Sequence, residues 1–102
     1  MISEIREQSV AIENLCRRFR VRRLELFGSA TGGGFDPLTS DLDFLVEFDS
    51  LRSNEYADAY FGLLEELKKL FQRELDLVMF GSVKNPYLRE SIQKTRTLLY
   101  AA

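Results

Sequence analysis

Apolar residues follow a helical spacing in three stretches of this chain, and each stretch predicts an amphipathic helix. The first covers residues 3–20 and begins at Ser3, a residue type that favours the N-cap position. The second runs from a cap at Ser53 or Asn54 to residue 73. The third runs from Pro86 to residue 100 after an N-cap at Asn85. The expected buried stripes are Ile5, Ile12, Leu15, Cys16 and Phe19; then Ala57, Tyr60, Phe61, Leu64, Leu67 and Phe71; then Tyr87, Leu88, Ile92, Thr95 and Leu99.

Shorter apolar segments lie between these helices, and their Val, Leu and Phe content predicts strands at residues 21–27, 41–48 and 74–80. The order is therefore helix, strand, strand, helix, strand, helix. This order predicts an α+β fold, in which a small mixed β-sheet of three strands has helices packed on one side. The 102 residues suit one compact unit, so we expect a single domain over residues 1–102.

The amino-acid composition argues against several classes of function. The chain is 45% hydrophobic with a net charge of −2, so it can build a core and gives no indication of direct nucleic-acid binding. No apolar run is long enough to span a membrane and no signal peptide is visible, so we expect a cytoplasmic protein. The one cysteine, Cys16, excludes an internal disulfide and is most simply a core residue. Because the chain has no histidine, catalysis must use carboxylates, hydroxyls, the thiol, lysine or arginine.

The residues best suited to chemistry lie where the first predicted strand ends and where the second begins. Gly28 and Ser29 end the first strand, and Asp41 and Asp43 open the second. Alternate strand residues point to the same face, so the two carboxylates should lie side by side. Their mutual repulsion is usually relieved by a divalent cation. Since backbone amides of a Gly-Ser turn suit phosphate oxygens, this pattern indicates chemistry on a nucleoside triphosphate.

A third acid, Asp76, stands among the apolar residues of the last predicted strand. An acid in such a setting is costly unless it is paired, solvated or bound to metal. Asp76 could lie at a sheet edge and face water or an arginine, or it could join Asp41 and Asp43.

Gly28-Ser29, followed after eleven residues by Asp41-x-Asp43, resembles the signature of the polymerase-beta-like nucleotidyltransferases. The flanking residues and the segment 85–92 resemble the small bacterial branch, the minimal nucleotidyltransferases, and the resemblance covers nearly the whole chain. It implies transfer of AMP from ATP to an acceptor hydroxyl. It implies two Mg²⁺ ions held by Asp41, Asp43 and Asp76, of which Asp76 orients the hydroxyl or accepts its proton. It also implies that Gly28 and Ser29 position the β- and γ-phosphates.

The resemblance further implies a partner. Short members of this family commonly pair with a separately encoded helical HEPN-type toxin, act as its antitoxin in a toxin–antitoxin system, and modify a toxin tyrosine. An oligomer with that partner is then expected. Two other interpretations stay open: an antitoxin of weak activity that neutralises its partner by binding alone, and an enzyme that uses a small-molecule acceptor.

One position departs from the family pattern. Relatives commonly carry an arginine in the loop after the Gly-Ser turn, where this chain has Gly32. A weak hold on the nucleotide is therefore expected, unless another cation such as Arg22 or Arg23 replaces the missing contact. Five arginines between residues 17 and 23 suggest either a solvated helix end or a basic edge that attracts phosphate or an acidic partner. They are Arg17, Arg18, Arg20, Arg22 and Arg23.

Overall fold

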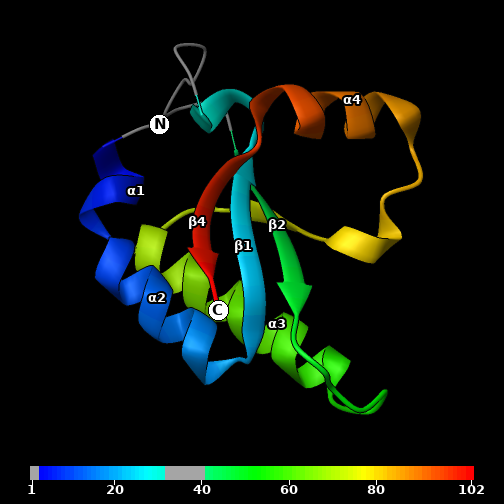
Figure 1. Cartoon of the computed structure of the whole chain (residues 1–102). Helices are drawn as coiled ribbons and strands as arrows, with labels where there is room; N and C mark the ends of the chain where they lie inside the picture. The colour runs from blue at the N-terminus through cyan, green and yellow to red at the C-terminus, as the bar shows by residue number, and fades with distance from the viewer. Residues whose placement is uncertain (1–2, 32–40) are drawn as a thin grey trace.

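A computed structural model describes residues 3–31 and 41–102, with Ser29 described in its backbone only (Figure 1). The sheet has four strands in the order β3-β2-β1-β4, in which β2 and β3 are parallel and the other neighbours are antiparallel. The elements are α1 (Ser3–Glu7), α2 (Ser9–Arg18), β1 (Val21–Phe27), the 3₁₀ turn η1 (Gly28–Thr31), β2 (Leu42–Phe48), α3 (Tyr56–Phe71), β3 (Leu75–Met79), the 3₁₀ turn η2 (Phe80–Ser82), α4 (Pro86–Thr95) and β4 (Thr97–Ala101). The expected α+β class with a mixed sheet is confirmed.

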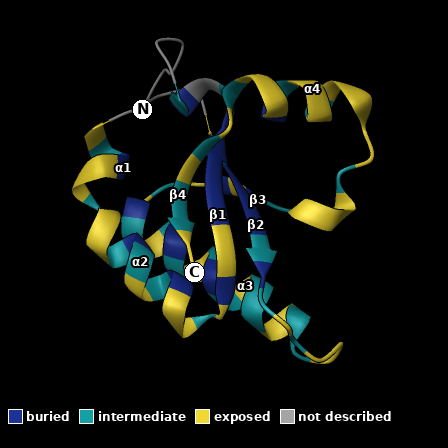
Figure 2. Cartoon of the chain, viewed as in Figure 1, coloured by how far each residue is buried: buried dark blue, intermediate teal, exposed yellow. Residues whose placement is uncertain are grey.

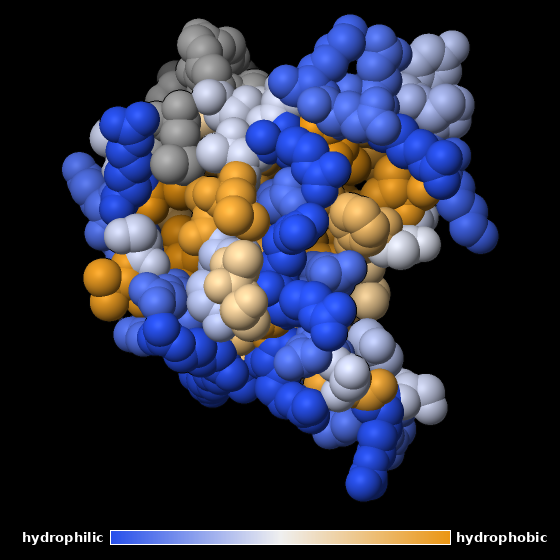
Figure 3. Space-filling view, in the orientation of Figure 1, coloured by the Kyte–Doolittle hydropathy of each residue, from blue (hydrophilic) through white to orange (hydrophobic). Residues whose placement is uncertain are grey.

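The alternation of side chains along β2 gives the sheet its two faces. Phe44 and Val46 are fully buried on the face that α2 and α3 cover, and they belong to the main core (Figure 2). Leu45 points to the opposite face, where it packs with Phe27 and with Ile92 of α4 in a second, smaller cluster. The longer helices therefore lie on one side, while α4 crosses the other, so the expectation that all helices pack on one side is wrong for α4. Figure 3 shows hydrophobic surface beneath α4, bordered by hydrophilic residues.

The first helical stretch forms two helices instead of one. The chain leaves helical geometry at Gln8, which has φ −100° and ψ 16°, and α2 ends before Arg20, which takes φ +58°. Ile5 and Ile12 are both buried in spite of the break, as their periodicity predicts. Cys16 is also buried, and burial, reinforced by the charge of Glu13, raises the pKa of its thiol to about 12. The interpretation of Cys16 as a core residue is confirmed.

The last stretch differs more. The expected helix over residues 86–100 ends at Thr95, and residues 97–101 form β4 along the open edge of β1. Asn85 is the predicted N-cap, and its side chain accepts hydrogen bonds from the backbone amides of Tyr87 and Leu88. At the other end, pairing with β1 satisfies backbone groups that a longer helix would leave exposed on that strand.

Each arginine between residues 17 and 23 lies within salt-bridge distance of a carboxylate, which favours the solvated-edge interpretation. Arg22 and Arg23 also lie at the opposite end of β1 from Gly28, so neither is placed to replace a loop cation at the turn. Gly32 itself lies outside the described residues. The pairs are Arg17–Glu13, Arg18–Glu66, Arg20–Glu55, Arg22–Asp49 and Arg23–Glu25.

In residues 3–31 and 41–102, no helix has both the length and the apolar character needed to cross a membrane. The longest, α3, has 16 residues and carries both lysine and glutamate side chains. The cytoplasmic location stays a prediction.

Glu25 is a buried carboxylate whose main partner, Arg96, lies at the surface. Glu25 is only 4% exposed, and both of its oxygens accept hydrogen bonds from Arg96, each at 2.7 Å. The Arg96 hydrogen bonds outweigh the effect of burial and lower the pKa of Glu25. Because Arg96→Ala leaves this buried carboxylate with only the longer contact to Arg23, at 3.6 Å, we expect the variant to lower the free energy of unfolding by about 2–3 kcal/mol.

Urea denaturation measures this loss directly, and Arg22→Ala is a matched control because it removes an exposed pair to Asp49. The control should cost at most about 1 kcal/mol. Equal losses in the two variants would show that the Glu25 pair has no special role in stability.

Candidate active site

Asp43 and Asp76 lie directly beside each other, because the parallel register of β2 and β3 pairs them. Asp43 is half-buried and Asp76 is exposed on the edge strand. Burial raises the pKa of Asp43 to about 6, with further contributions from the charge of Asp76, a hydrogen bond to Asp76 and the charge of Asp41. Two carboxylates on directly paired strand residues share a proton or require a cation.

Asp41 is close to this pair without joining it. It precedes β2 by one residue and its side chain is exposed. Within the described part of the chain, no three acidic or cysteine side chains converge as a metal cluster would. The structure therefore brings two of the three predicted acids together. The repulsion between Asp43 and Asp76 and their oxygen ligands fit a hard divalent cation such as Mg²⁺, and a contribution from Asp41 stays a prediction.

The Gly28 turn passes close over Asp43. Gly28 has φ +79°, a conformation that side chains disfavour, and a Cβ placed on it would lie 2.5 Å from Asp43 Oδ2. Glycine is thus required at this position both by the backbone and by the neighbouring carboxylate. The two halves of the sequence motif, Gly28-Ser29 and Asp41-x-Asp43, therefore meet in the structure.

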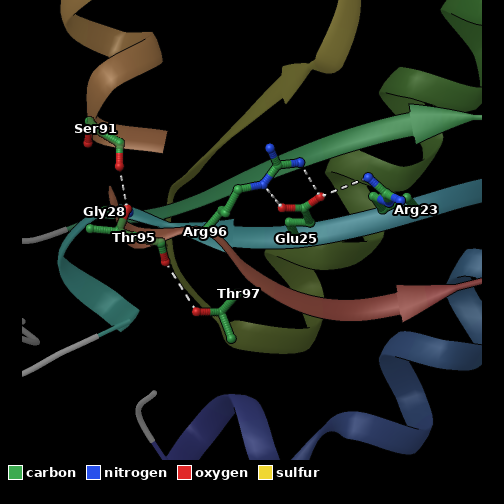
Figure 4. Close-up of polar contacts among 7 residues, drawn as sticks. All are labelled: Arg23, Glu25, Gly28, Ser91, Thr95, Arg96 and Thr97. Carbon is green, nitrogen blue, oxygen red and sulfur yellow. Dashed lines mark hydrogen bonds and ion pairs between the residues drawn. The ribbon is translucent and has the colours of Figure 1, made fainter. Parts of the chain in front are cut away.

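The amide of Gly28 does not serve as expected. A free N–H at this turn was a candidate for phosphate binding, but it donates to Thr95 Oγ1 at 2.8 Å (Figure 4). The Gly28 carbonyl accepts a hydrogen bond from Thr31 Oγ1, also at 2.8 Å. The contribution of Gly28 to the site is therefore its missing side chain, and the Ser29 side chain lies outside the description.

A cavity of about 460 Å³ opens at the acid pair. Sequence reasoning missed its contributions from α3 and α4. Tyr60 of α3 donates its hydroxyl to the Leu77 carbonyl of the edge strand at 2.6 Å, and Ser91 comes from α4. The spacing of Leu88, Ser91 and Thr95 along one side of α4 is the signal that could have identified this face. The lining residues are Phe27, Asp43, Tyr60, Leu64, Leu75, Asp76, Leu77, Val78, Leu88 and Ser91.

The raised pKa of Asp43 predicts how the stability of the metal-free protein depends on pH. The folded state binds this proton more tightly than the unfolded state, whose value is near 3.8. The cost of keeping this half-buried carboxylate charged beside Asp76 is therefore fully present well above pH 6 and is relieved as the pH falls through 6 toward 4. We expect the metal-free protein to gain about 1 kcal/mol between pH 7.5 and pH 5, after allowance for solvent screening.

This interval isolates the carboxyl pair, because the chain has no histidine to titrate within it. Denaturation in EDTA at the two pH values measures the gain, and Asp43→Asn should remove it. A variant that keeps the same pH dependence would exclude Asp43 as its source.

Comparison with known proteins identifies the family of this chain. A family model described as a nucleotidyltransferase domain matches residues 9–99. The chain belongs to the nucleotidyltransferase family. This nucleotidyltransferase is 32% identical over 94 residues to a Methanocaldococcus jannaschii protein named "Putative protein adenylyltransferase", and the match spans 91% of this chain and 92% of that protein.

Solved structures agree on the fold. A structure described as a "putative minimal nucleotidyltransferase" matches with a TM-score of 0.65 and 29% identity, over 90% of this chain and 89% of the other. A second match is to a chain of a complex between the tri-AMPylated HEPN toxin of Shewanella oneidensis and an MNT antitoxin. Its TM-score is 0.64 at 21% identity, over 96% of this chain and 73% of that one. The resemblance inferred from the Gly-Ser and Asp-x-Asp motifs is confirmed.

Proposed function

We propose that this nucleotidyltransferase moves AMP from ATP to an acceptor hydroxyl, with Mg²⁺ held by Asp41, Asp43 and Asp76. The observation that carries the proposal is the Asp43–Asp76 pair, set in register beneath the Gly28 turn. Nothing else in the described chain combines like-charged, crowded carboxylates with a cavity large enough for a substrate group. This arrangement suits phosphoryl chemistry, in which positioning and charge neutralisation supply most of the rate enhancement.

The acids have different roles in this mechanism. Asp43, half-buried and pressed against Gly28, is fixed and suits a ligand that holds charge in one place. Asp76 is exposed on the edge strand, so it can reach the acceptor hydroxyl, orient it and accept its proton. Bound Mg²⁺, as two ions, would neutralise the triphosphate and lower the pKa of that hydroxyl.

The bonds balance as in other nucleotidyl transfers. The acceptor oxygen forms a bond to the α-phosphorus, the bond from that phosphorus to the oxygen bridging the β-phosphorus breaks, and pyrophosphate leaves. The acceptor proton passes to Asp76. The turn at Gly28 and Ser29 would position the β- and γ-phosphates, with Gly28 allowing close approach to the acid pair.

We further propose that the acceptor is a tyrosine of a separately encoded HEPN-type toxin, which makes this protein the antitoxin of the pair. Support comes from the relative named as a protein adenylyltransferase and from the fold shared with a chain of the AMPylated toxin complex. Co-expression should then relieve the toxicity of the partner and add the mass of one or more AMP groups to it.

One alternative has an observation in its favour. The Gly28 amide is already bonded to Thr95, and Gly32 replaces the family's loop arginine, so the hold on a nucleotide is reduced. An antitoxin that works by binding alone would tolerate both features. Asp76→Asn separates the two proposals, since the enzyme should lose protection together with the added mass. Full protection with no added mass would establish binding alone.

A further inference from the structure

The end of β1 and the turn that follows it are held by the corner where α4 meets β4 (Figure 4). This corner is formed by three consecutive residues, and each one contacts a different residue in or next to the last part of β1. The contacts are the Gly28 amide on Thr95 Oγ1, the guanidinium of Arg96 on both oxygens of Glu25, and the strand pairing of Thr97 with Leu26.

The hydroxyl of Thr95 has a fixed direction. It lies 2.6 Å from the backbone carbonyl of Ser91, which can only accept, and 2.8 Å from the amide of Gly28, which can only donate. The single hydroxyl hydrogen therefore goes to Ser91, and a lone pair of the oxygen faces Gly28. A side chain without this oxygen would leave the amide of Gly28 without its partner, at a partly buried position.

Gly28 in turn has no freedom to move toward the acids. The space where its Cβ would stand is filled by Asp43 Oδ2, so any shift of the turn changes its distance to the acid pair. The hydrogen bond from Gly28 to Thr95 holds the turn from the side of α4, while Asp43 limits it from the side of the sheet. The relative position of the turn and the acids thus depends on Thr95, whose hydroxyl bonds to Gly28 and Ser91 and, in the proposed mechanism, binds no phosphate.

We propose that Thr95 is a positioning residue, which seats the Gly28-Ser29 turn against Asp43 so that triphosphate and acids are correctly spaced. The proposal rests on the proposed function, because it assigns to Thr95 a role in binding ATP at that turn. Its effect is on nucleotide affinity more than on folding, since Arg96 and Thr97 keep the corner attached to β1.

The test compares Thr95→Val, which has the same shape without the oxygen, with Thr95→Ser, which keeps it. Thr95→Val should raise the KM for ATP about fivefold to tenfold, and should weaken binding of a non-hydrolysable ATP analogue, measured by calorimetry, by a similar factor. Thr95→Ser should restore both. Thr95→Ala is the second variant without the oxygen, should the valine variant fail to fold.

Thr97→Val is the matched control. The hydroxyl that it removes donates to the Thr95 carbonyl at 3.2 Å and makes no hydrogen bond to the turn. Thr97→Val should leave nucleotide affinity unchanged. Hydrogen exchange of the Gly28 amide, followed by NMR, should accelerate in Thr95→Val alone.

The inference would be overturned by normal nucleotide affinity in Thr95→Val despite faster Gly28 exchange, or by equal losses of affinity in Thr97→Val. Absence of any nucleotide binding by the wild type would overturn it as well. Wild-type nucleotide binding without transfer would instead count against the proposed reaction and leave the role of Thr95 to be decided by affinity.

Discussion

Asp43→Asn is expected to lower the rate of AMP transfer by about a thousandfold or more. The change keeps the shape of the side chain and removes the charge at the centre of the proposed Mg²⁺ site, where Asp43 lies in register with Asp76. Because bound Mg²⁺ would supply both charge neutralisation and activation of the hydroxyl, losing a central ligand should affect the transition state more than ground-state binding. Steady-state transfer at saturating ATP and Mg²⁺ measures the effect.

Glu47→Gln is the matched control for this variant. Glu47 lies on the same face of β2 as Asp43, four residues further along and beside Arg23. Glu47→Gln therefore makes the same acid-to-amide change at a site away from the acid pair. Its transfer rate should equal that of the wild type. Substantial activity in Asp43→Asn, with the control also active, would exclude Asp43 as a metal ligand.

Gly28→Ala should have the second largest effect, because a single methyl group meets two obstacles. The backbone has φ +79°, which costs a non-glycine residue about 1–2 kcal/mol, and the new Cβ would stand 2.5 Å from Asp43 Oδ2. The turn or the carboxylate must move, so we expect lower stability and a loss of transfer activity of about a hundredfold or more. Thermal unfolding and transfer assays on the same preparation measure both effects.

The chain contains its own control for this substitution. Phe80-Gly81-Ser82 has the same sequence as Phe27-Gly28-Ser29, yet a Cβ placed on Gly81 would have no atom within 4 Å. Gly81→Ala should therefore leave stability and transfer nearly unchanged. If the two alanine variants behave alike, the contact between Gly28 and Asp43 is not what the motif requires.

Much of this fold could be predicted from local patterns. The first strand has the bounds that its apolar run predicts, and Asn85 with Pro86 begins α4 as their residue types indicate. The contact between Asp43 and Asp76 was not visible in any local pattern. It followed from the family resemblance, and the parallel register of β2 and β3 now explains it.

The C-terminal corner could not be predicted in the same way. Leu99 continues the helical spacing of Ile92 and Thr95, so periodicity alone favours a longer helix. What ends the helix is tertiary: the open edge of β1 accepts a strand, and Arg96 reaches a carboxylate 71 positions away in sequence. The bond between Gly28 and Thr95 has the same origin, and no motif in the sequence joins those residues.

The most direct test of the central claim is a comparison of two labels. The protein is incubated with the proposed HEPN-type partner, Mg²⁺ and ATP that carries the label either on the α-phosphate or on the γ-phosphate. Nucleotidyl transfer predicts that the α-label becomes covalently attached to the partner, that the γ-label leaves with pyrophosphate, and that EDTA or Asp43→Asn abolishes the attachment. Attachment of the γ-label, or undiminished attachment of the α-label in EDTA, would contradict the proposed reaction.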